Sequence, residues 1–338
     1  PADILPLSSL YLKIYFLGAL PNFVFEFGAA ILRAAGDTKT PMKYLIIAGA
    51  TNLVLNIIFV TLFGMDVDGV ATATVTAQLI SATLMIITLT NRKDECRLIF
   101  KQMKINWSVF KKIVKIGLPA GLNGSIFSIS NIIIQSSINS FGSAAIVSGN
   151  SAAASIEGFV YVAMNAFYQT SLNFTGQNMG AGNFKRVSQV LRRNLICVSC
   201  VGAVGGLSIF VFARPLLSLY VPGNEIAIQT GITRITYIGL FYFFGGIMEV
   251  FTGAIRGMGA SLTTLFISIG AVCGVRIVWI FTIFQIPKFH TLDSLYIVYV
   301  LSWLGCIVAQ LVAYNIINKH KKRVYEQRIK ERPKSFAK

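Results

Sequence analysis

Three glutamates and one arginine lie inside long runs of apolar residues. Glu26, Glu157 and Glu249 are the only acids in these runs, and Arg276 lies deep in another run. A charged side chain among apolar residues needs a partner, a proton or a bound ion. Each of the four is therefore a candidate for ion or substrate transport.

Two interpretations of Glu249 are open. Its carboxylate could bind a proton or a sodium ion and exchange it for a substrate. It could equally neutralise Arg276, on the following run, in a static buried pair. Glu157 lies in the small-residue stretch SAAASIEG, where helices approach closely. We therefore assign Glu157, Glu26 and Arg276 to cavity or counter-ion positions.

Asn52 and Asn56 are four residues apart, so they share one face of a helix, and Thr74 lies on the next run. Their neutral oxygens suit the coordination of sodium or a hydrogen bond to a protonated group. Hydrogen bonds that simply join two membrane helices are an equally natural role for such residues. The spacing alone slightly favours that second role.

The composition indicates an integral membrane protein. Hydrophobic residues make up 54% and charged residues 13% of the 338 residues, whereas soluble domains have about 25% charged residues. The net charge of +17 does not indicate nucleic-acid binding, because the basic residues lie in short gaps between apolar runs. Metal-protease, esterase and phosphate-loop motifs are absent from the sequence, so we expect no enzyme and no cofactor.

The apolar runs predict an all-α bundle that crosses the membrane nine times, because a helical crossing takes about 20 residues. The predicted spans are 10–32, 42–63, 69–91, 113–140, 144–174, 190–213, 226–254, 261–285 and 293–318.

Basic residues fall on one side of these spans. They gather in 92–112, in 319–338 and near residues 33–43, 185–193 and 256, whereas the opposite gaps contain only Lys288. Because Lys and Arg are enriched in cytoplasmic loops, this side and the carboxy-terminal tail are predicted to be cytoplasmic. Nine spans then put Pro1 outside, and the sequence has no initial Met or leader. We therefore expect an odd number of further helices upstream.

A short motif occurs twice, 223 residues apart. AAILRAAGDTKTPM (29–42) and GAIRGMGASLTTL (253–265) align Arg33 with Arg256, Gly36 with Gly259 and Glu26 with Glu249. This parallel repeat predicts two lobes of six helices, of which the first lacks three. The expected parts are a partial first lobe (1–91), a linker (92–112), a second lobe (113–318) and a tail (319–338).

The motif residues also have a structural explanation. Gly36 suits the left-handed position after a helix, and Arg33 suits the last helical turn. Thr40 can cap the next helix with Pro41 in its first turn. Pro119 can break another helix and free backbone carbonyls.

Four motifs, in this order, resemble those of the multidrug and toxic compound extrusion family. They are LRAAGDTKTPM (32–42), KIGLPAGL (115–122), GQNMGAG (176–182, with Gly176, Gln177, Gly180 and Gly182) and IRGMGASLT (255–263). The resemblance implies twelve helices in two lobes, of which this chain has helices four to twelve.

The resemblance also implies site residues. In the family's first-lobe cation site, two polar residues four apart are followed by one on the next helix, a pattern that Asn52, Asn56 and Thr74 match. This match favours coordination over helix joining. The same site uses an aspartate on the family's first helix, which this chain lacks. Two acids that some members place in the second lobe correspond here to Phe127 and Gly245, although Glu249 lies one turn after Gly245.

The resemblance implies a monomeric exporter in the plasma membrane that exchanges organic cations or other drugs for sodium ions or protons. Two alternatives remain: a lipid-linked oligosaccharide flippase of similar architecture, or an inactive membrane fragment. A flippase needs a strongly cationic cavity. The other bases within the runs (Lys13, Lys115, Arg214 and Arg234) lie nearer the ends of their runs, which argues against one.

Overall fold

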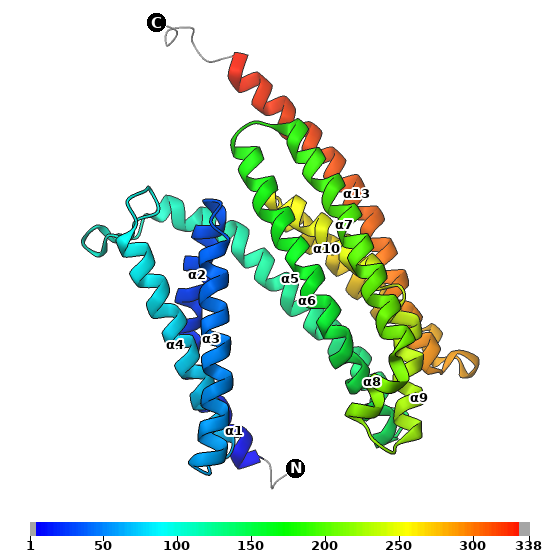
Figure 1. The fold of residues 1–338 in the computed structure, drawn as a ribbon. Helices are drawn as coiled ribbons and strands as arrows, with labels where there is room; N and C mark the ends of the chain where they lie inside the picture. Colours follow the sequence, from blue (N-terminus) through cyan, green and yellow to red (C-terminus); the bar gives the residue numbers. More distant parts are fainter. Residues whose placement is uncertain (1–4, 331–338) are drawn as a thin grey trace, which may run out of the picture. The chain divides into compact units, whose positions relative to one another are not determined.

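The computed structural model describes residues 5–330, and this part of the chain is helical without a strand (Figure 1). The α-helices are α1 (Leu5–Leu17), α2 (Ala19–Ala34), α3 (Lys39–Ile57), α4 (Val67–Asn91), α5 (Trp107–Asn139), α6 (Ala144–Gly180), α7 (Phe184–Val211), α8 (Ala213–Tyr220), α9 (Glu225–Arg234), α10 (Tyr242–Gly257), α11 (Ser261–Ile267), α12 (Val275–Phe281) and α13 (Leu292–Lys330). Wider π turns occupy Ile58–Leu62, Ile235–Gly239 and Ser268–Gly274, and short 3₁₀ turns occupy Phe100–Gln102, Ile283–Gln285 and Pro287–Phe289.

The chain divides into two compact units, Pro1–Ile105 and Asn106–Lys338. In the first, α4 packs against α1, α2 and α3, and Phe25, Leu32 and Met85 belong to its buried core. In the second, α6 packs against α7, α9 and α10, and α13 packs against α10. The second unit holds both large buried clusters of apolar side chains.

Six helices within residues 5–330 are long and apolar enough to cross a membrane, and two further candidates are pairs bent by 43° and 46°. The bent pairs lie at the spans predicted for 10–32 and 226–254. The span predicted at 144–174 is helix α6, but α6 does not meet the same criterion. Its many polar residues, which include Asn150, Glu157 and Asn165, explain the difference.

Two helices are longer than their apolar runs predict. Helix α5 begins at Trp107, inside the predicted linker, because the Asn106 side chain accepts hydrogen bonds from Ser108 N and Val109 N. Helix α13 continues to Lys330, so the first part of the predicted tail is helical. Residues 331–338 lie outside the described residues.

Glycines let α10 lie against α6 with almost no space between their backbones. A Cβ atom at Gly253 would lie 2.5 Å from the carbonyl oxygen of Tyr168, and one at Gly257 would lie 2.7 Å from that of Leu172. Only glycine fits at such distances, so these two residues fix how far apart the helices lie. Glu249 and Arg256 lie on the same stretch of α10, so this contact also fixes their position along the axis of α6.

Both copies of the repeated motif form the same turn. Gly36 has a φ of +92° and Gly259 a φ of +79°. Gly36 N donates to Arg33 O at 3.0 Å, and Gly259 N donates to Arg256 O at 2.8 Å. A left-handed glycine ends each helix, and the next helix follows within a few residues.

The capping at the first copy differs from the prediction. Helix α3 begins at Lys39, so Thr40 is not its cap and Pro41 is its third residue, where it is buried. Asp37 takes the capping role instead, because its carboxylate accepts hydrogen bonds from Thr40 N at 3.1 Å and from the Thr40 hydroxyl at 2.9 Å.

Candidate functional site

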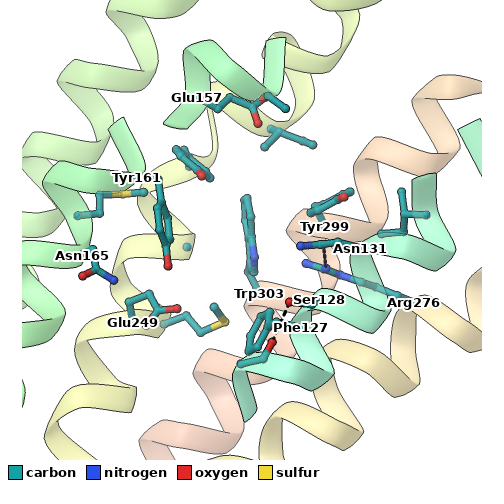
Figure 2. A pocket seen from close by; sticks show the side chains of 18 of the residues that line it. Phe127, Ser128, Asn131, Glu157, Tyr161, Asn165, Glu249, Arg276, Tyr299 and Trp303 are labelled. Carbon is teal, nitrogen blue, oxygen red and sulfur yellow. Dashed lines mark hydrogen bonds between the residues drawn. The ribbon is translucent and has the colours of Figure 1, made fainter. Parts of the chain in front are cut away.

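A cavity of about 750 Å³ lies inside the second unit. Side chains of α5, α6, α10, α12 and α13 line it, and so does Arg234 at the end of α9 (Figure 2). Two acids, three arginines and several aromatic rings share this space. The polar and aromatic lining residues include Phe127, Ser128, Asn131, Asn150, Glu157, Tyr161, Asn165, Arg234, Tyr242, Glu249, Arg256, Arg276, Tyr299 and Trp303.

Glu157 and Arg234 form a buried ion pair at one end of the cavity. Arg234 Nη2 lies 2.8 Å from Glu157 Oε2, and Arg234 Nε donates to both carboxylate oxygens at 3.1 and 3.2 Å. Arg234 Nη1 donates to Asn150 Oδ1 at 2.8 Å. The Tyr296 hydroxyl donates to the same oxygen at 3.3 Å. The pair is therefore well hydrogen-bonded, as a buried pair must be.

Close packing of α6 and α9 brings this pair together. A Cβ atom at Gly149 would lie 2.1 Å from the carbonyl oxygen of Ala227, so the two backbones touch one residue before Asn150. One face of α6 then presents Asn150 and Glu157, which are seven residues apart, toward Arg234. Arg234 lies at the end of α9, as predicted, but its side chain is buried, paired with Glu157 and part of the cavity wall, which the sequence did not predict.

Glu249 lies on the opposite side of the cavity from Arg276, near Tyr161 and Asn165 (Figure 2). Its carboxylate forms no hydrogen bond or ion pair with any residue in the described range 5–330. Of the two open interpretations of Glu249, the static pair with Arg276 is therefore wrong. The two residues lie on different walls, with Trp303 between them in the view.

Arg276 is held by neutral groups. Its Nε donates to the Ser302 hydroxyl at 3.1 Å, and its Nη1 donates to Asn131 Oδ1 at 3.1 Å and to the Ser130 hydroxyl at 3.4 Å. The guanidinium carbon lies 4.2 Å from the centroid of the Tyr299 ring. Arg276 is 2% exposed, and within the described residues no acid lies at ion-pair distance from it.

The two motif arginines have different partners. Arg33 Nη2 lies 3.4 Å from Glu26 Oε2, so the predicted candidate Glu26 is half-exposed and paired within α2. Arg256, at the corresponding place in α10, donates to the Tyr168 hydroxyl at 2.8 Å and to the Thr264 hydroxyl at 3.3 Å. Arg256 thereby joins α10 to α6 and α11 at the edge of the cavity.

The remaining motif residues are structural in position. Gly182 has a φ of +71° and ends α6 in a turn like those at Gly36 and Gly259. A Cβ atom at Gly176 would lie 3.7 Å from Gly257 O, and Gly180 and Gln177 belong to the last turns of α6. Pro119 is buried inside α5 without ending the helix.

In the first unit, Asn52, Asn56 and Thr74 come together. Asn52 Nδ2 donates to the Thr74 hydroxyl at 3.2 Å, and Asn56 Nδ2 donates to Asn52 Oδ1 at 3.1 Å. Asn56 Oδ1 is buried and accepts no hydrogen bond from a described group. This free oxygen can accept a cation or a proton donor. The one acid in the three apolar runs of the first unit is Glu26, which is already paired with Arg33.

Sequence reasoning did not assign Asn150, Tyr299 or Trp303 to a site, and it named Arg234 only as a base near the end of its run. The spacing of Asn150 and Glu157 places both on one helical face, and that pattern could have indicated a polar wall. Arg234 is 77 residues from Glu157, so its pairing depends on the packing of α6 against α9.

The MatE family profile matches residues 1–62 and 119–282. The probable multidrug resistance protein YpnP of Bacillus subtilis (strain 168) is 31% identical over 269 residues, which cover 80% of this chain and 60% of YpnP. The probable multidrug resistance protein NorM of Thermotoga maritima is 28% identical, over 76% of this chain and 56% of NorM. An FAD transporter of Shewanella oneidensis is 26% identical, over 64% of this chain and 48% of that protein. The chain thus spans less than two thirds of the length of these relatives.

Solved structures share the fold. The Vibrio cholerae MATE transporter VcmN in its bent form has a TM-score of 0.79 at 21% identity, over 96% of this chain and 72% of VcmN. A multidrug resistance MATE family transporter in its outward-facing conformation has a TM-score of 0.83 at 19% identity, over 94% of this chain and 70% of that one. With the family profile and the relative at 31% identity, this agreement confirms the resemblance of the four motifs: the chain belongs to the MatE family of multidrug and toxic compound extrusion transporters.

Proposed function

We infer that the protein acts as a secondary active multidrug exporter in the plasma membrane. It exchanges organic cations or other xenobiotics for sodium ions or protons by alternating access. The observation that carries this inference is Glu249, an acid in a drug-sized cavity that forms no hydrogen bond or close ion pair with residues 5–330, although Arg256 on the same helix attracts its charge. Ligand pockets have volumes of about 300–1,000 Å³, so this cavity can hold a small molecule.

The free carboxylate gives exchange a physical basis. A carboxylate that faces a cavity attracts one cation at a time, whether a proton, a sodium ion or the positive group of a drug. Entry of the coupling ion from one side therefore releases the drug, and entry of the drug from the other side releases the ion. Glu157 is less suited to this exchange, because Arg234 already occupies both of its oxygens.

Asn52, Asn56 and Thr74 are the second proposed coupling site. The buried, unpartnered Asn56 Oδ1 supports this role, because helix-joining amides normally satisfy both of their polar atoms. Sodium accepts neutral oxygen ligands, so the residues present fit the ion in type. The carboxylate that the family places at this site has no equivalent among the described residues, so the three side chains alone would bind the ion weakly.

A flippase or another exporter of anionic molecules remains the alternative. The cavity is more cationic than the sequence predicted, because Arg234, Arg256 and Arg276 all line it beside two glutamates. The similarity to a protein named as an FAD transporter supports a substrate range wider than drugs. Export of a dye separates the alternatives, since neither a flippase for lipid-linked sugars nor an inactive fragment would lower the dye content of cells.

The test measures ethidium efflux from cells without other exporters that express the complete gene product. We expect efflux that stops when the sodium or proton gradient is removed. Glu249→Gln should reduce coupled efflux about tenfold or more, because the amide cannot exchange a cation. Glu225→Gln is the matched control, since Glu225 is exposed and pairs with Arg214 outside the cavity. Normal efflux by Glu249→Gln would overturn the assignment of Glu249.

A further inference from the structure

A second pocket lies at the surface of the second unit, between the turn that joins α6 to α7 and the carboxy-terminal part of α13, which runs past that turn (Figure 1). Its volume is about 1020 Å³. The basic residues that line it are Lys185 and Arg192 on α7 and Lys322 on α13. One acid, Glu326, also lines it, and its Oε1 lies 3.9 Å from Lys322 Nζ. Lys185 and Arg192 form no ion pair within the described range 5–330, so the pocket is cationic.

The Tyr325 ring on α13 closes one side of this pocket. The end of the ring fills the space that a Cβ atom at Gly182 would take, so the ring lies directly against the turn after α6. The same ring packs edge-on against Phe184 at the start of α7, with 5.5 Å between the ring centroids. These two contacts hold the end of α13 against the turn, so the pocket has a fixed aromatic wall beside its basic residues.

The basic residues of α7 form two pairs, of which one faces the pocket. Lys185 and Arg192 are seven residues apart, so they share the helical face that lines it. Arg186 and Arg193 are also seven apart and are exposed, but they lie on the neighbouring face and do not line the pocket. The general enrichment of basic residues on one side of a membrane accounts for both pairs. It does not account for the meeting of the first pair with Lys322.

The pocket lies where two apolar runs end. Its lining residues come from 181–192 and 318–326, and the apolar runs 190–213 and 293–318 start and stop at these segments. Ile196, one turn after Arg192, is 55% exposed, and Leu311, on the apolar part of α13, is 46% exposed. A ligand in the pocket can therefore have its charged group among the basic residues and an acyl chain along the apolar helix surfaces. Basic pockets between helices at this level suit the headgroups of anionic lipids.

We propose that this pocket binds the phosphate of an anionic phospholipid headgroup. Lys185 and Arg192 bind the phosphate from α7, where the fork of Arg192 can donate to two of its oxygens, and Lys322 binds it from α13. The bound lipid joins the start of α7 to the end of α13, so it stabilises the folded protein. The pocket shares no lining residue with the cavity around Glu249, so the inference does not depend on which compound is exported.

Phosphatidylglycerol and phosphatidylcholine with the same acyl chains form the matched pair of probes. Both have a phosphate, but the quaternary ammonium of phosphatidylcholine cancels its charge. Native mass spectrometry of the complete protein, freed of lipid in detergent, measures the affinity for each. We expect phosphatidylglycerol to bind about tenfold or more tightly and to raise the unfolding midpoint. Glycerol 3-phosphate, which has the phosphate without acyl chains, should leave the midpoint unchanged at the same concentration.

Variants then assign the binding to the pocket. The double variant Lys185→Gln with Arg192→Gln should weaken phosphatidylglycerol binding by about tenfold or more. Arg186→Gln with Arg193→Gln removes the same charge from the neighbouring face and should leave binding within about twofold. Tyr325→Ala should weaken binding although every charge remains, because it releases the end of α13, whereas Tyr325→Phe keeps the ring and should bind normally. The unfolding midpoint of each variant without lipid checks that the fold is intact.

Three results would overturn the proposal. Equal binding of the two lipids by the wild-type protein would show that charge does not select the ligand, a result that depends on no variant. Equal losses in the two double variants would show a general attraction between basic helix ends and anionic lipid, without a site. Equal stabilisation by glycerol 3-phosphate would assign the pocket to a soluble phosphate compound and not to a lipid. Drug efflux is not a readout in this experiment, so failure here leaves the proposed export function untouched.

Discussion

At the scale of single residues, the two buried arginines differ in what surrounds their charge. Arg234 has a carboxylate partner in Glu157, whereas Arg276 has only neutral partners. Removal of Arg234 therefore has different consequences from removal of Arg276. Loss of Arg234 leaves Glu157 buried and unpaired, but loss of Arg276 does not leave an acid without its partner.

Arg234→Ala should destabilise the protein by about 3–5 kcal/mol, because it leaves a buried carboxylate without its counter-ion. The double variant Arg234→Met with Glu157→Met should recover most of this loss, since an apolar pair of similar volume has no charge to desolvate. Thermal unfolding of purified protein and the yield of folded protein measure the effect. Equal stability of the single and double variants would show that the pair does not hold α6 to α9.

Asn56→Leu should abolish coupled efflux and leave membrane insertion intact. The reason is that Asn56 Oδ1 is the buried oxygen that no described group occupies. Efflux in cells and the amount of protein in the membrane fraction are measured together. Thr83→Val is the control, because Thr83 lies on α4 but donates only to Leu79 O in its own helix. Normal efflux by Asn56→Leu would reduce the cluster to helix packing.

At the scale of elements, local contacts were predictable and distant ones were not. The meeting of Asn52 with Asn56 follows from helical spacing, and that with Thr74 follows from the adjacent helix. The ion pair of Arg234 with Glu157 and the hydrogen bonds of Arg276 join residues far apart in the sequence, so they depend on how whole helices pack. Sequence spacing carries no information about these distant contacts, so it could not decide between the two interpretations of Glu249.

The turn between α2 and α3 should weaken in acid. Partial burial opposes ionisation of Asp37, but hydrogen bonds from Thr40 and Arg92 outweigh it, so the pKa of Asp37 is lowered. A carboxyl with a lowered pKa adds stability above its unfolded pKa of about 3.9, and that stability is lost as the pH falls through the lowered value. Asp37→Asn should therefore lower the unfolding midpoint at neutral pH, and this difference should shrink as the pH falls through the lowered pKa of Asp37. Glu95→Gln, an exposed change nearby, is the control. A constant difference across the pH range would contradict the prediction.

At the scale of the whole molecule, the sequence predicted the class of fold, and its membrane topology is still a prediction. Composition was enough to predict membrane helices, because hydropathy reports directly on the lipid environment. Four motifs were enough to indicate the family. The sequence predicted a span at 144–174, but helix α6 is more polar than the six helices that are apolar enough to cross a membrane, since it contributes one wall of the cavity. Nine crossings with a cytoplasmic basic side remain our prediction.

Labelling from each side of the membrane tests this topology. Lys104→Cys and Lys288→Cys, each in a cysteine-free background, are treated in intact cells with a maleimide that cannot cross the membrane. Because basic loops stay in the cytoplasm, we expect label at position 288 and none at position 104 until the cells are opened. Label at both positions in intact cells would contradict the predicted orientation.

The glycine contact between α6 and α10 also limits how the protein can evolve. A mutation at Gly253 or Gly257 adds a side chain where no space exists. Selection should remove most variants at these positions because they fold poorly, whatever compounds they would bind. Phe127, Ser128 and Trp303 face the cavity and hold no such backbone contact. Under the proposed export function, changes at these positions should therefore alter the range of compounds exported, and laboratory selection with an unfamiliar drug should find them first.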